Sequence, residues 1–425
     1  MELKKYKLGE LLDVKRGASL AGEHYATSGE YIRLTCGNFD YQNNSFKVNI
    51  SKDNLYYTGP VREEFLMKKG DIITPLTEQA TGLLGSTAII PEDDKYIQSQ
   101  DIAKVICNED LLCPSFAFYL ISSDAVKKQL SAAAQQTKIR HTSPDKIKDC
   151  TVWIPDLPTQ EKIGRILSDI DSKIALNRAI NRNLEALAKQ LYDYWFLQFD
   201  FPDENGKPYK SNGGKMLWNE KLKIEIPDGW KAIPLSQIMS YEGGSQPPAS
   251  DFIYQKQHGY VRFVQIRDYY SDSHITYIPV RKGNKLCSET DIMIARYGAS
   301  LGRICYGLNG AYNVALAKVT PKKKEYTEFI RTYLVSNVFY NKINTIGLRA
   351  AQAGFNKDDI ENILIPFPSD DIIIVCFQKL IESNFMARLH NDKENKIIIK
   401  QRDELLPLLM NGQVSLNSDL SHDYE

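Results

Sequence analysis

The stretch IKDCTVWIP at residues 147–155 returns, with its pattern kept, as IENILIPFP at residues 360–368. Both begin with Ile, pass through polar residues into apolar ones, and end in Pro. The two stretches start 360 − 147 = 213 residues apart in a chain of 425 residues. Solenoid repeats have periods of roughly 20–50 residues. A repeat at half the chain length therefore predicts two copies of one domain.

Other matches follow in the same order in both halves. YKLGELLDVKRG at residues 6–17 resembles IPLSQIMSYEGG at residues 233–244, and GLLGSTAII at residues 82–90 resembles ASLGRICY at residues 299–306. These matches align Gly17 with Gly244 and Gly85 with Gly302. The offset drifts slowly, as short loop insertions would produce. Apolar strands alone could make any α/β domain look repetitive, but they do not predict ordered matches.

Each copy is predicted to have a globular part followed by a helical part. Short apolar or alternating runs between Gly, Asn and Asp indicate strands, and residues 115–130 and 328–343 indicate helices. The fold class is therefore α/β (mixed α+β). We place the first globular domain at residues 1–157, a helical region at 158–198, a linker at 199–226, the second globular domain at 227–369, a second helical region at 370–412 and a polar tail at 413–425.

Both helical regions carry an apolar seam. From Ile163 to Trp195, steps of four and three residues select apolar positions and two asparagines, Asn177 and Asn181. Adding 214 leads to Asn391 and Asn395 in the second helix. A buried asparagine in such a seam lowers stability and fixes register; the alternative is that these asparagines face solvent. Neither helix can bury its stripe alone, so we predict an antiparallel coiled coil that relates the two copies by a pseudo-two-fold axis.

Composition excludes several classes of protein. Lys plus Arg and Asp plus Glu both number 53, so the net charge of zero does not indicate a strongly basic nucleic-acid binder. Seven scattered cysteines without a CxxC pair argue against a disulfide framework or a metal site, and fit a reducing cytoplasm. The sequence has no run of 18 apolar residues, so we expect no membrane span. The first residues do not resemble a signal peptide.

Enzyme motifs are missing from the sequence. There is no GxxxxGK[ST] or HExxH motif, and no GxSxG in a strand–turn–helix context. The cofactor-binding glycine motif and the catalytic Asn/Asp-Pro-Pro-aromatic motif of an adenine methyltransferase are also missing. We therefore expect a chain without catalytic residues and without a cofactor of its own.

The ordered set of features resembles the specificity subunit of type I restriction–modification systems. The resemblance rests on two domains alternating with two helical regions, on VWIPDLPTQEKIGRILSDIDSKI at residues 152–174, and on YWFLQFDFPDENGKPYKSNGGKMLWNEKLKIEIPDGW at residues 194–230. It implies two target-recognition domains that each read one half of a bipartite, asymmetric DNA target. It also implies helices that set the spacing and hold two methyltransferase subunits, which bind S-adenosylmethionine, and a restriction/translocase subunit that joins them. The alternative is a coiled-coil adaptor that reads no DNA.

Two loops in each copy are candidates for contact with DNA. ARYGASLGR at residues 295–303 offers Arg296, Tyr297 and Arg303, and the matching LTEQATGLLG at residues 76–85 offers Thr77, Glu78 and Gln79. Arginine can bridge guanine O6 and N7, and glutamine can pair with adenine. The resemblance adds the loop before each opening stretch, with Gln135, Gln136, Lys138 and Arg140 in copy one and Arg349 and Gln352 in copy two. The alternative for each residue is an ordinary solvated loop.

Overall fold

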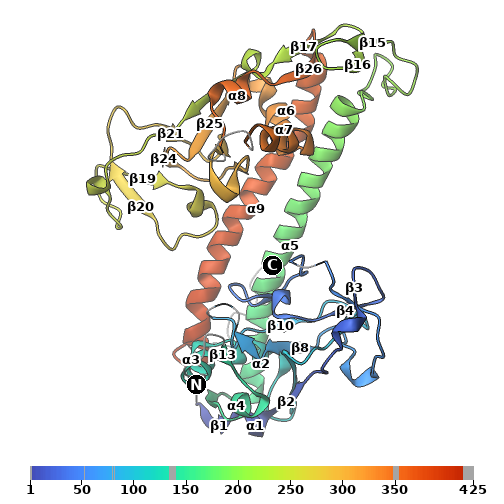
Figure 1. Cartoon of the computed structure of the whole chain (residues 1–425). Coiled ribbons are helices and arrows are strands. Elements are labelled where there is room, and N and C mark those ends of the chain that lie inside the picture. The colour runs from blue at the N-terminus through green and yellow to red at the C-terminus, as the bar shows by residue number, and fades with distance from the viewer. Residues whose placement is uncertain are drawn as a thin grey trace, which may run out of the picture. The chain divides into compact units, whose positions relative to one another are not determined.

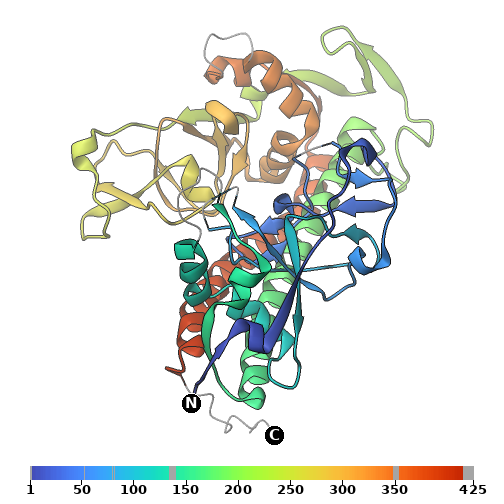
Figure 2. The ribbon, with the colours of Figure 1, turned by 60° about the horizontal axis from the view of Figure 1, so that its bottom comes forward.

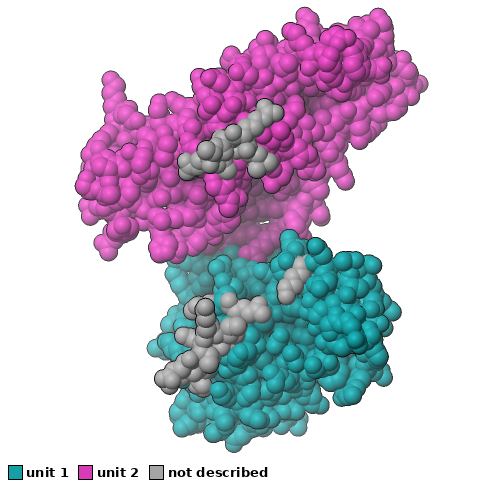
Figure 3. All heavy atoms as spheres, viewed as in Figure 1, with its two compact units in different colours: residues 1–175, 397–425 teal, residues 176–396 magenta. Residues whose placement is uncertain are grey.

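The computed structural model describes residues 2–51, 53–78, 80, 82–133, 140–347 and 354–414. The chain divides into two compact units (Figure 3). Unit 1 joins residues 1–175 to residues 397–425, and unit 2 holds residues 176–396. The division cuts through both long helices, α5 (Leu157–Tyr192) and α9 (Ile372–Met410), so each helix contributes to both units.

Both units combine short strands with a few helices. The elements of unit 1 before α5 are β1 (Lys4–Lys7), α1 (Leu8–Leu11), β2 (Leu12–Arg16), β3 (Tyr25–Ala26), β4 (Tyr31–Arg33), β5 (Phe39–Asp40), β6 (Ser45–Phe46), β7 (Tyr56–Tyr57), β8 (Ile72–Pro75), β9 (Thr77–Glu78), β10 (Ala88–Ile89), β11 (Tyr96–Ile97), β12 (Ile102–Cys107), α2 (Pro114–Ile121), α3 (Asp124–Ala133), β13 (Arg140–His141), α4 (Pro144–Lys148) and β14 (Thr151–Ile154). The elements of unit 2 between α5 and α9 are β15 (Met216–Asn219), β16 (Ile224–Pro227), β17 (Trp230–Pro234), β18 (Met239–Gly243), β19 (Tyr260–Val264), β20 (Thr276–Pro279), β21 (Leu286–Cys287), β22 (Ile292–Ala295), β23 (Ile304–Cys305), β24 (Gly310–Tyr312), β25 (Leu316–Pro321), α6 (Thr327–Val335), α7 (Asn337–Gly347), α8 (Lys357–Glu361) and β26 (Leu364–Pro368). The mixed α/β class predicted from the sequence is confirmed.

The first sheet has the same topology in both copies. Its strand order is β10-β8-β12-β2 in unit 1 and β23-β22-β25-β18 in unit 2, and every neighbouring pair is antiparallel. The central strands are apolar on both faces: Ile72 and Ile292 face the helix-side core, while Ile73 and Met293 face the second sheet. This two-sided burial explains why these strands read as unbroken apolar runs.

The second sheet repeats as well. One inner strand pairs in parallel with one neighbour in both copies, β4 with β11 and β19 with β24, and antiparallel with the other, β7 and β20. The fourth strand, β3 in copy one and β21 in copy two, lies at opposite edges of this shared set. In unit 2 the second sheet lies on the far side of the first sheet from α9 (Figures 1 and 2). Shared topology at this level of detail confirms the duplication that the sequence predicts.

The repeated stretches that open the sequence each end in the last strand of a copy. β14 pairs antiparallel with β1 along Lys4↔Ile154, and β26 pairs with β17 along Trp230↔Pro368. Alternate side chains of these strands are buried, Val152 and Ile154 in one copy and Ile365 and Phe367 in the other. The last strand of each copy therefore closes its globular part onto the first strand, immediately before the chain enters a long helix.

Two glycines at the end of the first-sheet edge strand have a shared packing reason. A Cβ on Gly17 would lie 2.4 Å from the carbonyl oxygen of Ser99, and a Cβ on Gly244 would lie 2.1 Å from that of Asn313. The next backbone N–H in each copy donates across the same gap, from Ala18 to the Gln98 carbonyl and from Ser245 to the Tyr312 carbonyl. Only glycine lets the two backbones approach this closely.

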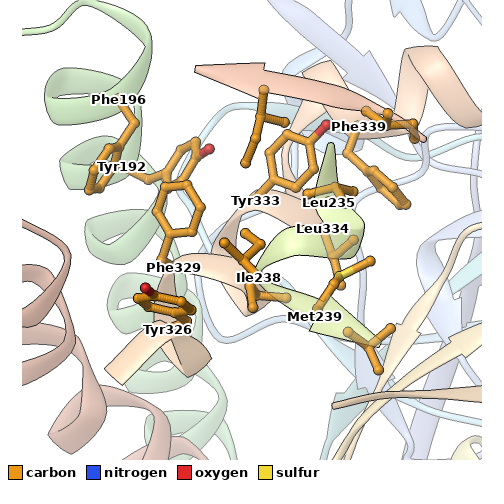
Figure 4. Packing of buried hydrophobic residues seen from close by; sticks show 14 of the residues in the cluster. Tyr192, Phe196, Leu235, Ile238, Met239, Tyr326, Phe329, Tyr333, Leu334 and Phe339 are labelled. Atoms are coloured by element: carbon orange, nitrogen blue, oxygen red, sulfur yellow. The ribbon is translucent and has the colours of Figure 1, made fainter. Parts of the chain in front are cut away.

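The ends of the helix pair are built into the cores. In unit 1, Ile163 and Leu167 of α5 join Leu409 and Met410 of α9 in the same apolar cluster. In unit 2, Trp195, which follows α5, lies 6.0 Å from Phe377 of α9. Figure 4 shows Tyr192 and Phe196 beside Phe329 of α6, with ring centroids 5.5 and 4.8 Å from the Phe329 ring. Each core therefore depends on both long helices.

The segment between α5 and the second globular part is folded. Its strands β15 and β16 form a two-stranded antiparallel hairpin. The Phe201 ring stacks between those of Tyr209 and Trp230, at centroid distances of 4.8 and 5.2 Å. Aromatic stacking of this kind adds to the free energy gained from burial alone, so this segment is anchored to the start of β17.

The asparagines lie in the seam of the helix pair in unit 2. Asn177, which is 1% exposed, donates through Nδ2 to Oδ1 of Asn395 at 3.1 Å and to Oε2 of Glu394 at 2.7 Å. Asn391 Nδ2 donates to Asn181 Oδ1 at 2.9 Å. Partner numbers fall along α9 as they rise along α5, so the helices run antiparallel. The first asparagine of each helix meets the second of the other, which is the exchange that a two-fold pairing requires.

We predict that Gly244→Ala lowers the free energy of unfolding by about 1–3 kcal/mol, because its methyl group collides with a backbone carbonyl that cannot rotate away. Gly283→Ala is the matched control, since no atom lies within 4 Å of its added Cβ. Thermal and denaturant unfolding of both variants measures the difference. Equal stability of the two variants would contradict the close-approach explanation.

We predict that Asn177→Ala destabilises the protein by about 1–3 kcal/mol, because it leaves the buried amide of Asn395 without its partner. The control is Asn183→Ala on the exposed face of the same helix, where alanine should be neutral or slightly stabilising. Denaturant unfolding curves give both values. A neutral Asn177→Ala would mean that the seam contact contributes nothing to stability.

Candidate nucleic-acid interface

In each copy, a short β-bridge joins the two loops that the sequence singled out separately. In copy one, β13 pairs with β9 through Arg140↔Glu78 and His141↔Thr77. In copy two, Tyr297 forms an isolated bridge with Gly354. The residues that meet are about 60 positions apart in the chain, so the fold assembles one site from two segments. Six candidates, Gln79, Gln135, Gln136, Lys138, Arg349 and Gln352, lie outside the described residues, and Arg140 is described only in its backbone.

The loop of copy two is a tight turn between β22 and β23. The backbone N–H of Ala295 donates to the Arg303 carbonyl, and that of Gly302 donates back to the Ala295 carbonyl, both at 2.9 Å. Gly298 and Gly302 have φ angles of +70° and +77°, which favour glycine. A Cβ on Gly302 would also lie 3.2 Å from Ile343 of α7. The turn therefore holds its arginines at the surface of a packed scaffold.

Arg296 begins this turn between two aromatic rings. Its guanidinium carbon lies 5.9 Å from the ring centroid of Tyr241 and 5.1 Å from that of Tyr297. Its Nη1 donates to the Val314 carbonyl at 3.3 Å, whereas its buried Nε has no acceptor among the described residues. Burial raises the pKa of the Tyr241 hydroxyl, which the neighbouring Arg296 charge partly offsets. Tyr241 is therefore neutral and does not compensate the charge of Arg296.

Arg303 ends the turn on the face of a third ring. Its guanidinium carbon lies 3.8 Å from the centroid of Tyr270, a residue that is 66% exposed. The Tyr270 hydroxyl lies 3.5 Å from Oγ of Ser300 in the same turn. Tyr270 follows the 3₁₀ helix η7 (Ile266–Tyr269), after β19 of the second sheet. The sequence analysis missed Tyr270, because no fixed spacing links it to Arg303 and only the packing of the two sheets brings them together.

The arginines of this turn differ from other arginines of unit 2 in their charge partners. Within the described part of the chain, neither Arg296 nor Arg303 forms an ion pair with a carboxylate. By contrast, Arg262 pairs with Asp272 at 2.8 Å, Arg281 with Asp251 at 2.6 Å and the buried Arg331 with Glu328 at 3.1 Å. Two guanidinium groups held among aromatic rings without an anion suit an external hydrogen-bond acceptor.

The equivalent loop of copy one is chemically different. Equivalent backbone positions carry Leu76 in place of Arg296, Thr77 in place of Tyr297 and Ser86 in place of Arg303. All three are buried, and the Thr77 hydroxyl lies 3.3 Å from Asp101 Oδ1 and 3.4 Å from His141 Nδ1. The Thr77 side chain thus contacts other groups of the protein in this structure, and its contact with DNA stays a prediction.

Cys36 and Glu78 form further hydrogen bonds that hold strand β9 in place. The Cys36 thiol donates to the Thr77 carbonyl at 3.5 Å, and burial raises the pKa of that thiol to about 11, which keeps it protonated. Glu78 is also buried and accepts a hydrogen bond from the backbone N–H of Gly82 at 2.8 Å. Copy one thus presents an inward-facing strand without arginine where copy two presents arginines.

Other kinds of site find no support in the described residues. Among them, no group of three or more His, Cys, Asp or Glu side chains is arranged to hold a metal ion. Within the same ranges, no helix is both long and apolar enough to cross a membrane.

Comparison with known proteins gives consistent matches along the chain. Residues 1–186 and 227–400 match the family described as "Type I restriction modification DNA specificity domain". The chain is 23% identical over 414 residues to the HindI specificity subunit of Haemophilus influenzae, covering 84% of this chain and 89% of that protein. It is 22% identical over 324 residues to the MjaIX specificity subunit of Methanocaldococcus jannaschii, covering 73% and 71%. A solved type I S subunit from M. genitalium shares the fold, with a TM-score of 0.62, 16% identity and coverage of 98% and 97%.

We predict that Thr77→Val lowers the free energy of unfolding by about 1 kcal/mol, because the isosteric change removes the hydroxyl contacts with Asp101 and His141. Differential scanning calorimetry measures the change. Thr58→Val provides a control, since the Thr58 hydroxyl makes its contact with the His24 carbonyl on the exposed surface. A Thr77→Val variant as stable as the control would show that the buried hydroxyl does not hold the strand.

Proposed function

Because the chain belongs to the family of type I restriction modification DNA specificity domains, we propose that it is the subunit that reads the DNA target for a restriction–modification complex. Each of its two globular copies reads one half of a bipartite, asymmetric target. The chain itself performs no chemistry and binds no cofactor. The family match and the specificity-subunit relatives, which cover most of the chain, favour this function over a coiled-coil adaptor that reads no DNA.

The observation that carries the proposal is the uncompensated turn of copy two. Arg296 and Arg303 lack carboxylate partners among the residues described, although a chain with zero net charge offers as many acidic as basic groups. Basic groups left unpaired in a neutral protein indicate a surface for an anion or an acceptor-rich ligand. The DNA major groove presents acceptors that arginine recognises. The corresponding loop of copy one differs at each of these positions, as two unlike half-sites require.

The helix pair supports the two-reader arrangement. Antiparallel pairing with exchanged asparagine contacts is what a duplicated reader needs, because it gives each copy the same relation to the helices. We propose that the pair sets the spacing between the two half-sites. Readers on a rigid spacer can recognise two short sequences separated by bases that neither contacts.

We further propose that α5 docks a methyltransferase subunit. Leu176, Ile180 and Leu187 of α5, with Tyr194 just after its end, are between 37% and 55% exposed. They follow one another at intervals of four and seven residues. Such a stripe fits a helix of a partner protein. Two methyltransferases carrying S-adenosylmethionine would supply adenine methylation and part of the phosphate contact, and a restriction/translocase subunit would add cleavage. DNA reading, methylation and cleavage would all take place in the cytoplasm, where the DNA lies.

The most direct test of the bipartite target is a map of methylated adenines across the host genome. The proposal requires a motif of two short specified segments with unspecified bases between them. A single undivided motif would contradict two readers, and the lack of neighbouring genes for an adenine methyltransferase and a translocating endonuclease would favour the adaptor.

We predict that Arg296→Ala in the complex with its methyltransferases weakens binding to the target by about 10- to 100-fold and changes binding to scrambled DNA much less. Arg281→Ala is the matched control, because both Nη atoms of Arg281 are bonded to Asp251 in the same copy. Fluorescence anisotropy at a fixed salt concentration measures both. Equal losses on target and scrambled duplexes would mean that Arg296 contacts phosphate and reads no base.

A further inference from the structure

Resting on the proposed function, we infer that Tyr270 and Arg303 form one prebuilt unit that reads a guanine in the half-site of copy two. Tyr270 is the positioning residue and Arg303 makes the contact with the base. The assignment goes beyond the turn itself. Tyr270 lies just after η7, between the second-sheet strands β19 and β20, whereas Arg303 lies beside a strand of the first sheet.

The first argument is the stack. The guanidinium carbon of Arg303 lies 3.8 Å from the Tyr270 ring centroid, closer than any other Arg or Lys contact with a tyrosine ring in the described chain. The ring is 66% exposed, so burial in a core does not account for its position. Its hydroxyl lies 3.5 Å from Oγ of Ser300, so the ring sits beside the same turn that carries Arg303. A guanidinium packed against the face of a ring is restricted in its tilt, which narrows the directions that its N–H groups can take.

The second argument is the state of the Arg303 side chain. Its Nη1 is buried and finds no acceptor among the described residues, and no carboxylate there pairs with the group. A buried donor without an acceptor costs free energy, which is recovered when the side chain turns Nη1 toward a ligand acceptor. A planar guanidinium with unused donors matches the O6 and N7 acceptors of guanine, which two parallel N–H groups reach together.

The third argument is the contrast between the copies. The position equivalent to Arg303 in copy one is Ser86, which is fully buried and donates to the carbonyl of Leu83. The backbone frame is the same, with Gly85 at φ +78° and Gly302 at φ +77°. The arginine is therefore not required by the turn. A residue that the shared scaffold does not need, present in one copy alone, is suited to a feature that one half-site alone has.

The test uses the complex with its methyltransferases and its mapped target. Binding is measured on duplexes in which each base pair of the copy-two half-site is changed in turn. With the unaltered protein, one G·C pair should be preferred by about 10- to 100-fold. Arg303→Ala should abolish the preference at that position and leave the other half-site unchanged. Tyr270→Ala should weaken the same preference, and Tyr270→Phe should restore most of it, because the phenyl ring keeps the stack.

The control is Arg267→Ala, an exposed arginine of η7 that does not touch the turn and should leave every preference intact. Thermal unfolding of each variant confirms that the complex is folded. An equal loss on all duplexes would assign Arg303 to phosphate, and unchanged preferences would remove it from the interface; either result overturns the inference. If the unaltered complex discriminated no sequence at all, the proposed function itself would fail.

Discussion

The antiparallel pairing of α5 with α9 is the contact on which both units depend. Neither helix has an apolar stripe that it could bury alone, and each unit takes a segment of both helices into its core. Several polar groups inside this seam bind one another. In unit 1, Arg402 donates from Nη1 to Asp171 at 2.7 Å, and the Tyr119 hydroxyl donates to the other oxygen of that carboxylate at 2.7 Å. In unit 2 the asparagines of α5 and α9 bind one another across the seam. A shifted register would leave these groups buried without partners, so the seam specifies one alignment.

The duplication shows which features belong to the shared backbone framework and which belong to the candidate site. Both copies keep the same strand order in the first sheet, the same close backbone approach at Gly17 and Gly244, and the same positive-φ glycine where the turn packs on a helix. These features are backbone constraints, and they leave the side chains of the turn free to differ. Copy one fills its turn with Leu76 and Ser86, and copy two with Arg296 and Arg303. A protein that must read two unlike half-sites needs this combination of a constant frame and variable side chains.

Net charge is a poor guide to this molecule, whereas the placement of its ion pairs is informative. Of the unit 2 arginines, several are neutralised by carboxylates close at hand, Arg331 even inside the core against Glu328. Arg296 and Arg303 in the turn of copy two lie against aromatic rings. An aromatic ring orients a guanidinium without cancelling its charge, because the attraction comes from the ring quadrupole. A chain with a net charge of zero can therefore present a local positive site.

Much of the fold could be predicted from residue order. The repeated stretch identified the closing strand of each copy, alternation identified the half-buried strands, and spacing identified the helix seam with its asparagines, because each of these signals lies within one element. The candidate loops were also visible, as glycine-rich segments between strands. Residue order could not show that Thr77 points inward, that the two loops of each copy meet through a β-bridge, or that Tyr270 lies under Arg303. These depend on which sheets pack together and bring distant segments into contact, and no local pattern encodes that packing.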